Sequence, residues 1–247
     1  MKLFSWVTKD TTIDFMRGRK LGYVLSILMV VLSCACIAVK GFNYGIDFSG
    51  GILMEIKANQ KIDVEAMRKT LSHVDLDEIN LQTIGENGDE VMIRAQAKDM
   101  NEKEQMAAVN SIKSTLGSSY EYRRVELVGP QVGDELKVDG IVASVIAVFA
   151  ISLYIWFRFK DIRFALGAMI GLIHDLITIV GLLSFFDLDF SLTTVAAILT
   201  LAGYSVNDTV VTYDRIRENL RKFKKMNQYD LLNKSINDIF SRTILTG

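Results

Sequence analysis

One aspartate inside an apolar run is the residue whose type and position most clearly indicate chemistry. From Ser191 to Tyr213 the only charged residue is Asp208. An ionised side chain at the centre of a membrane helix costs about 2.5–3.5 kcal/mol, so it usually faces a bundle interior or a wet cavity and has a polar partner. Asn207 stands beside it, and Ser205 lies on a neighbouring part of the same helix surface. The pattern predicts a functional intramembrane acid that serves a proton or a sodium ion; a structural hydrogen bond between helices is the alternative.

A second polar pair lies about midway along the preceding apolar segment. His174 and Asp175 are adjacent, and successive residues on a helix point about 100° apart, so both can face one polar seam. One interpretation is a second titratable site or a bracing group for Asp208. The other is a simple hydrogen-bonded pair between helices, which is often worth only about 0.6 kcal/mol. The sequence leaves both interpretations open.

The composition indicates a protein that is partly embedded in a membrane. The 247 residues are 50% hydrophobic with a mean hydropathy of +0.25, which is high for a soluble domain and low for a chain that is membrane-embedded throughout. The net charge of −1 argues against a nucleic-acid-binding protein, which needs a basic face. No nucleophile–base pair or cluster of metal ligands is visible in the sequence. We therefore expect neither an enzyme nor a metal site, and no cofactor beyond a coupling ion.

Four apolar segments are long enough to span a membrane. The predicted division is a cytoplasmic segment 1–20, spans at 21–39, 138–157, 164–186 and 190–213, an external domain 40–137, a cytoplasmic amphipathic segment 214–240, and the start of a fifth span at 241–247. Basic residues gather before the first span, in the 158–163 loop and after residue 214, which places the N-terminus in the cytoplasm. A cleaved signal peptide is the alternative for the first span, but its flanks lack a convincing cleavage site, which favours an uncleaved anchor.

The residues between the first two spans predict a small domain with both helices and strands. Alternating apolar residues indicate strands near 52–57 and 91–95, and two further strands are expected near 79–84 and 120–128, with Asn87-Gly88 in a hairpin turn. Asp63 and Asn101 are expected to cap two helices, and the lone His73 is interpreted as a surface or capping residue. The order β-α-β-β-α-β is that of the ferredoxin-like split unit. The predicted fold class is an α+β membrane protein, an α-helical transmembrane bundle with an inserted ferredoxin-like external domain.

Two glycine-containing stretches flank this domain. The first lacks the Gly-Lys-Ser/Thr of a phosphate loop and the Gly-x-Ser-x-Gly spacing of a nucleophile elbow. Both are therefore predicted to be structural turns between the domain and the spans. Their distinctive residues are Gly45, Asp47, Ser49, Gly50 and Gly51 in the first stretch, and Gly129, Pro130 and Gly133 in the second.

Three stretches, in this order, resemble the SecF proteins of the SecD/SecF protein-export family, within the resistance-nodulation-division superfamily. They are Gly45-Ile-Asp-Phe-Ser-Gly-Gly51, Val128-Gly-Pro-Gln-Val-Gly133, and the run 203–219 with Asn207-Asp208 and Asp214-Arg-Ile-Arg-Glu-Asn219. The ending Ser241-Arg-Thr-Ile244 is similar to the start of that family's fifth span. Because the family has six spans, this chain is expected to be C-terminally short of the full pattern.

The resemblance implies an accessory subunit of the bacterial Sec export machinery, located in the inner (cytoplasmic) membrane. It implies that the chain works with SecD and the SecY/SecE/SecG translocon on preproteins, and that the proton-motive force drives late, ATP-independent steps. It also implies that Asp208 is the family's intramembrane aspartate and Arg242 its fifth-span arginine, so that ionised Asp208 is expected to seek Arg242. Two other functions fit the sequence: a proton-coupled exporter of lipids or small molecules, and a non-transporting scaffold subunit. A nucleic-acid partner is not expected.

Overall fold

The computed structural model describes residues 11–72, 74, 79–85, 87–95, 100–117 and 119–246. The chain divides into two compact units. Unit 1 comprises Met1–Phe42, Ser144–Leu188 and Ala196–Gly247, and unit 2 comprises Asn43–Ala143 and Asp189–Val195. Two of the long helices cross a boundary and contribute residues to both units.

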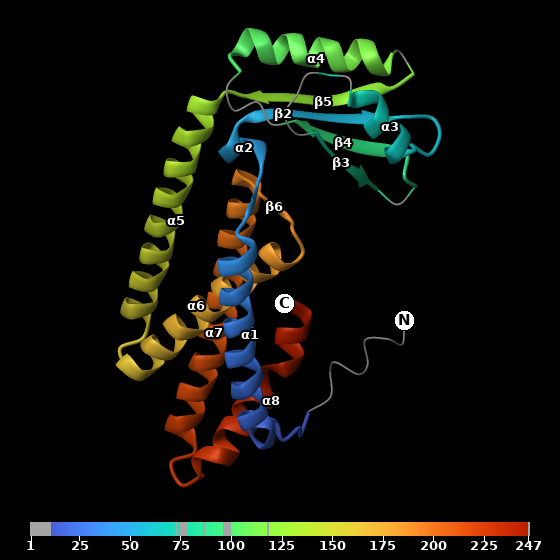
Figure 1. Ribbon diagram of the computed structural model, residues 1–247. Coiled ribbons are helices and arrows are strands. Elements are labelled where there is room, and N and C mark those ends of the chain that lie inside the picture. The colour runs from blue at the N-terminus through green and yellow to red at the C-terminus, as the bar shows by residue number, and fades with distance from the viewer. Residues whose placement is uncertain are drawn as a thin grey trace. The chain divides into compact units, whose positions relative to one another are not determined.

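Long helices make up the described part of unit 1 (Figure 1). Its elements are the 3-10 turn η2 (Phe15–Gly18), α1 (Arg19–Lys40), the later part of α5 (Pro130–Arg158), α6 (Ile162–Phe185), most of α7 (Leu192–Lys222) and α8 (Gln228–Thr246). Among the described residues, four helical stretches are long and apolar enough to cross a membrane: Phe15–Lys40, Pro130–Arg158, Ile162–Phe185 and Leu192–Lys222. The structure is therefore that of a membrane protein with a mixture of helices and strands.

Two of these helices, α5 and α7, extend beyond the apolar segments from which the spans were predicted. Helix α5 begins at Pro130, so the turn predicted for the second glycine-containing stretch is wrong from that residue onward. Proline suits a first helical turn because its missing N–H would have no partner there. Helix α7 continues past Tyr213 through charged residues to Lys222, and α8 runs without a break through the junction at residue 241. Residues 1–10 and 247 of the predicted end segments lie outside the described residues.

Small residues let the helices of unit 1 approach closely. Its buried core combines residues of α5, α6 and α7, including the alanines Ala165, Ala168 and Ala202. Helix α1 packs along α6, and Gly181 of α6 lies directly against Ser33 of α1. A Cβ atom at Gly181 would overlap the Ser33 side chain, so this contact requires glycine.

The sheet of unit 2 has four antiparallel strands in the order β3-β4-β2-β5 (Figure 1). These strands are β2 (Gly51–Lys57), β3 (Ile79–Ile84), β4 (Glu90–Ala95) and β5 (Glu121–Val128). Met54 of β2 pairs with Ile93 of β4 and with Val125 of β5. The residues expected to alternate toward the core, such as Ile52, Met54 and Val91, are fully buried. The strand positions predicted from period-2 alternation are thus confirmed.

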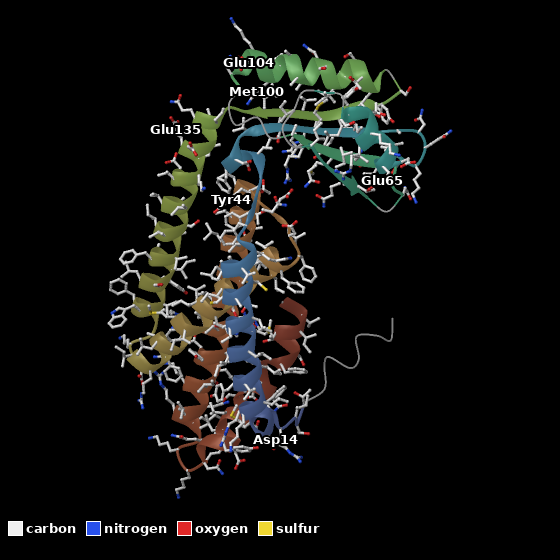
Figure 2. The ribbon with its side chains drawn as sticks, viewed as in Figure 1. Asp14, Tyr44, Glu65, Met100, Glu104 and Glu135 are labelled. Atoms are coloured by element: carbon white, nitrogen blue, oxygen red, sulfur yellow. The ribbon has the colours of Figure 1, made fainter. Side chains whose placement is uncertain are left out.

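Two helices complete the core of this unit, and the predicted N-caps of both are confirmed. Asp63 accepts hydrogen bonds from the backbone at the start of α3 (Val64–Leu71). Asn101 forms a reciprocal capping box with Glu104 at the start of α4 (Glu102–Leu116), where Figure 2 labels Glu104. Both helices pack on the sheet through buried apolar residues, namely Met67, Leu71, Val109 and Ile112. His73, which was interpreted as a surface or capping residue, lies outside the described residues, as does Glu86 directly before the predicted Asn87-Gly88 hairpin turn.

A two-stranded parallel pairing in unit 2 has no counterpart in the sequence-based prediction. Strand β1 (Asn43–Tyr44) pairs with β6 (Asp189–Phe190), which precedes α7. The side chain of Arg94 on β4 forms an ion pair with Asp189. Two-residue strands carry no periodicity, so only the tertiary structure reveals this junction.

Candidate functional site

A cavity of about 620 Å³ lies between α6 and α7 in unit 1. It is formed by side chains at helical spacing on the two facing surfaces, because residues three or four positions apart share one face of a helix. Helix α6 contributes Asp175, Thr178 and Ile179, and helix α7 contributes Leu201, Tyr204, Ser205, Asn207 and Asp208. The cavity therefore brings two carboxylates from different candidate spans to one polar space.

Asp208 is the less constrained of the two acids. Its residue is half-buried and lines the cavity. Its backbone carbonyl accepts a hydrogen bond from Thr212 at 2.9 Å, whereas its carboxylate makes no hydrogen bond or ion pair with any other residue that the structure describes. Asn207 is exposed beside it at the cavity wall. A carboxylate placed this way is open to a proton or a cation entering the cavity.

Asp175 is held from two sides. One of its carboxylate oxygens accepts a hydrogen bond from Ser205 on α7, and the other lies 2.9 Å from Nδ1 of His174. The bond to Ser205 joins two candidate spans directly. Asp175 therefore links α6 to α7 at the wall of the cavity that contains Asp208.

Two further polar atoms near this pair are buried and unsatisfied. Nε2 of His174 and Oγ1 of Thr178 have no hydrogen-bond partner among the described residues. Buried polar atoms are normally paired with protein or ordered water, so these two atoms are exceptions within this seam. Thr178 also lines the cavity.

Arg242 is not part of this cavity. It is exposed near the C-terminal end of α8, and no ion pair joins it to Asp208 within the described residues. The structure thus brings together four of the five predicted intramembrane residues: Asp208 and Asn207 on α7, and His174 and Asp175 on α6. The fifth stands on a separate helix.

A polar network at the charged end of α7 was missed in the sequence, where the residues were interpreted only as a membrane boundary. Asn219 is 2% exposed, and its side-chain amide donates to Ser235 Oγ at 2.9 Å and to Asp238 Oδ2 at 3.1 Å on α8. Arg215, one turn earlier, pairs with Asp238 at 2.9 Å. The i, i+4 spacing of Arg215 and Asn219 was the available signal, because it places both on one helix face. Helix α8 is thereby fastened to α7.

The same network sets the ionisation of Asp238. Burial alone would raise the pKa of this carboxyl, but hydrogen bonds from Asn219 and Lys234 and the charge of Arg215 outweigh burial and bring the pKa below its ordinary value. A third member of the stretch, Asp214, forms an ion pair with Arg158 at the end of α5. The charged run after Tyr213 thus joins α5, α7 and α8.

The segment before α1 is docked along another face of α8. Asp14, labelled in Figure 2, accepts hydrogen bonds from Tyr229 at 2.7 Å and from Asn233 at 2.7 Å. Asn237, a further turn along α8, accepts from the backbone N–H of Ile13 at 2.9 Å. The hydrogen bond from Tyr229 is the main reason that the pKa of Asp14 lies below its usual range.

The first glycine-containing stretch forms a compact joint in unit 2. After the four-residue helix α2 (Ile46–Ser49), Gly50 and Gly51 have φ angles of 68° and 136°. A Cβ atom at Gly51 would lie 2.5 Å from the carbonyl oxygen of Ala95, so no larger residue fits. Asp47 accepts a hydrogen bond from the backbone N–H of Leu192, the first residue of α7, at 2.9 Å. Ser49 donates to the Gly45 carbonyl at 3.0 Å.

The second stretch packs against this joint. A Cβ atom at Gly133 would lie 3.0 Å from the backbone nitrogen of Gly50, and Pro130 lies against Gly50 from the first turn of α5. Gly129 precedes that helix. These contacts give both glycine-containing stretches a structural role at the starts of α5 and α7.

Comparison with known proteins agrees with this architecture. Residues 108–247 match the family described as protein export membrane protein SecD/SecF, C-terminal, and residues 37–62 match the SecD/SecF GG motif. The protein translocase subunit SecF of Rickettsia felis is 44% identical over 237 residues, which cover 94% of this chain and 76% of that protein. The corresponding protein of Rickettsia prowazekii is 42% identical over 245 residues, covering 98% of this chain and 78% of that one.

Two solved structures of SecDF have a similar fold. The crystal structure of SecDF, a translocon-associated membrane protein from Thermus thermophilus, is similar with a TM-score of 0.82 and 29% identity over 100% of this chain. A SecDF structure in the super-membrane-facing form gives a TM-score of 0.64 and 29% identity over 96% of this chain. The chain spans 33% and 32% of the lengths of those two proteins. It therefore belongs to the SecD/SecF family of protein-export membrane proteins, on the SecF side of that family.

Proposed function

We propose that this chain is an accessory subunit of the bacterial Sec machinery that works with SecD and uses the proton-motive force to drive late, ATP-independent steps of preprotein translocation. The observation that carries the proposal is the position of Asp208, an acid without a protein partner among the described residues, in a cavity between two candidate spans. The names of the relatives, which are protein translocase subunits, support the same process.

The two acids of the cavity have different roles in this proposal. Asp175 stays in place because Ser205 and His174 hold it. Asp208 takes up and releases the coupling ion, a proton or a sodium ion, because its carboxylate is open to the cavity. An ionised carboxylate in a membrane is costly, so each uptake or release changes which arrangement of α6 and α7 is most stable. A charge that crosses the whole membrane gains about 2.3 kcal/mol per 100 mV, which sets the energy available per ion.

Arg242 is the cation expected to approach Asp208 when the acid is ionised. It stands on α8, which Asn219 and Arg215 fasten to α7. The separation of Arg242 from the cavity is consistent with a cycle in which the pair forms in only one state. In this proposal the structure represents a state of the cycle in which Asp208 and Arg242 are not paired with each other.

We further infer that unit 2 is a ferredoxin-like domain on the outer side of the bacterial inner membrane, with the N-terminus of the chain in the cytoplasm. The element order β2-α3-β3-β4-α4-β5 and the sheet order β3-β4-β2-β5 support the fold. The basic residues that follow α5 and end α7 support the orientation. In this proposal the domain meets emerging preprotein, and the SecY/SecE/SecG translocon lies alongside.

The test compares export into inverted membrane vesicles that contain the complete complex, with ATP alone and with an added ion gradient. Asp208→Asn is expected to abolish the stimulation by the gradient while leaving ATP-driven export and assembly with SecD intact. Asp139→Asn, the same chemical change at an exposed residue of α5, serves as the control. Separate proton and sodium gradients identify the coupling ion. Full stimulation in the Asp208→Asn vesicles would instead favour a scaffold role.

A further inference from the structure

A basic cleft of about 530 Å³ lies at the charged end of unit 1, away from the Asp208 cavity. Four cationic side chains and only two acids line it. The cations are Arg158 at the end of α5 and Arg217, Arg221 and Lys222 in the last turns of α7, and the acids are Asp214 and Glu218. The cleft therefore carries an excess of positive charge.

The two acids of the basic cleft already form ion pairs with arginines. Asp214 pairs with Arg158 and lies 3.5 Å from Arg217. Glu218 pairs with Arg215 at 2.8 Å, outside the lining. Arg221 and Lys222 are exposed and form no ion pair with any acid in the described part of the chain. Their charge is consequently available to an incoming anion.

A second, aromatic cleft of about 380 Å³ lies at the turn between α5 and α6, next to Arg158. Its lining is Trp156, Phe157, Phe159, Lys160, Ile162 and Ala165. Phe159 is 2% exposed and connects the two clefts, because the guanidinium groups of Arg158 and Arg217 lie 5.8 and 6.0 Å from its ring centroid. Phe157 and Trp156, in contrast, are 75% and 50% exposed.

This turn lies at a membrane surface, since it joins two candidate spans, one ending at Arg158 and the next beginning at Ile162. Exposed tryptophan and phenylalanine at such a level are typical of the boundary between acyl chains and headgroups. Arginine guanidinium groups match the geometry of a phosphate, with parallel N–H donors. One end of the site is thus suited to a phosphate and the other to hydrocarbon.

We propose that the basic cleft and the aromatic cleft together bind an anionic phospholipid, with its phosphate among Arg217, Arg221 and Lys222 and its acyl chains along Trp156 and Phe157. The usual bias toward positive charge on one side of a membrane accounts for the number of basic residues here. It does not account for their convergence on one concave site beside an aromatic cleft. Basic pockets between membrane helices are a known form of lipid headgroup site. The proposal does not depend on ion coupling at Asp208.

The test measures lipid binding to the purified protein in detergent by native mass spectrometry, with phosphatidylglycerol and phosphatidylcholine as probes. The variant Arg221→Gln/Lys222→Gln removes two charges that line the basic cleft. The matched control, Lys224→Gln/Lys225→Gln, removes two exposed charges from the segment directly after α7 that do not line the basic cleft. A third variant, Arg221→Lys/Lys222→Arg, keeps the charge and shows whether the site tolerates repacking.

The unchanged protein is expected to prefer phosphatidylglycerol. Arg221→Gln/Lys222→Gln should weaken that binding about 10- to 30-fold, as expected for two basic side chains at an anionic lipid surface, and the control pair should weaken it less than about threefold. The charge-preserving variant should bind like the unchanged protein. Equal losses in both neutralised pairs would overturn the proposal, because they would indicate diffuse attraction. Displacement of the lipid by inorganic phosphate at equal concentration would also overturn it, because the site would then select a soluble anion.

Discussion

The hydroxyl of Ser205 on α7 donates a hydrogen bond to the carboxylate of Asp175 on α6. Ser205 lies three residues before Asp208 on α7. This bond fixes one acid at the cavity wall and leaves the other open. Two aspartates therefore share one cavity between two candidate spans: the carboxylate of Asp175 is held by hydrogen bonds, and that of Asp208 has none among the described residues. The difference between them arises from hydrogen bonding, since both residues are aspartates.

Replacing Ser205 by alanine removes the interhelical donor. Hydrogen bonds between membrane helices are worth about 0.6 kcal/mol on average and up to about 1.7 kcal/mol. We expect Ser205→Ala to lower the thermal midpoint of the detergent-solubilised protein by a few degrees. Ser152→Ala is the control, because within the described residues Ser152 bonds only to a carbonyl of its own helix. An equal effect of the two substitutions would show that the contact between α6 and α7 contributes nothing specific.

Replacing Asn219 by alanine disrupts the attachment of α8. The buried amide donates to both Ser235 and Asp238, so its loss leaves polar groups without a donor and costs about 1–3 kcal/mol. We expect a lower thermal midpoint and faster amide hydrogen exchange in α8. Thr200→Ala on the exposed face of α7 should leave both measurements unchanged, since Thr200 bonds only within its helix in the part of the chain that the structure describes. Unaltered exchange in α8 of the Asn219 variant would contradict the assignment.

Acid is expected to release the segment before α1 from α8. The pKa of Asp14 is lowered from 3.8, mainly by the hydrogen bond from Tyr229 and then by the one from Asn233. A carboxyl whose pKa is lower in the docked state stabilises docking fully above its free pKa, and this stabilisation disappears as the pH falls through the lowered value. Docking should therefore be constant from neutral pH to about 3.8 and weaken below it.

Hydrogen exchange at the Ile13 and Met16 amides, corrected for its intrinsic pH dependence, measures this release. Both amides donate to asparagines of α8. In Asp14→Asn the protection should be reduced and should no longer change near the pKa of a carboxyl. A variant that kept the acid-dependent step would assign that step to another group.

Adding one methyl group to Gly181 tests the contact between α1 and α6. Its Cβ would overlap Ser33, and overpacking of this kind typically costs about 1–3 kcal/mol. We expect Gly181→Ala to lower the thermal midpoint clearly. Gly171→Ala on the same helix is the matched control, because nothing lies within 4 Å of its Cβ position. Adding Ser33→Gly to the Gly181 variant should restore only part of the midpoint, because the Cα atom of Ser33 itself lies 2.6 Å from the added Cβ position. No recovery at all would place the clash elsewhere.

Local patterns in the sequence were sufficient to predict some of the strands, helix caps and polar residues. Period-2 alternation located β2 and β4, and the Asp63 and Asn101 caps followed from residue type at the helix starts. The polar seam was also foreseeable, because a charged residue such as Asp175 or Asp208 stands out in an apolar run. In each case the signal lies within a few consecutive residues.

Features that depend on distant partners could not be predicted in the same way. Ser235 and Asp238 show no sign in the sequence that they meet Asn219, and the pairing of Asn43 with Asp189 joins residues far apart in the chain. The start of α5 at Pro130 was missed because glycine and proline were interpreted as a turn, although proline is equally suited to a first helical turn. The position of Arg242 outside the cavity likewise depends on tertiary packing.

Helix α7 continues without interruption from Asp208 to Asn219, a distance of about 16 Å at 1.5 Å per residue. The acid in the cavity and the anchor of α8 therefore sit on one stiff rod. Asn219 and Arg215 hold α8 against this helix, so a tilt of α7 would move the attached part of α8 with it. Two groups carried by one rigid body keep a fixed separation, so the proposed approach of Arg242 to Asp208 requires α8 to shift or bend relative to α7.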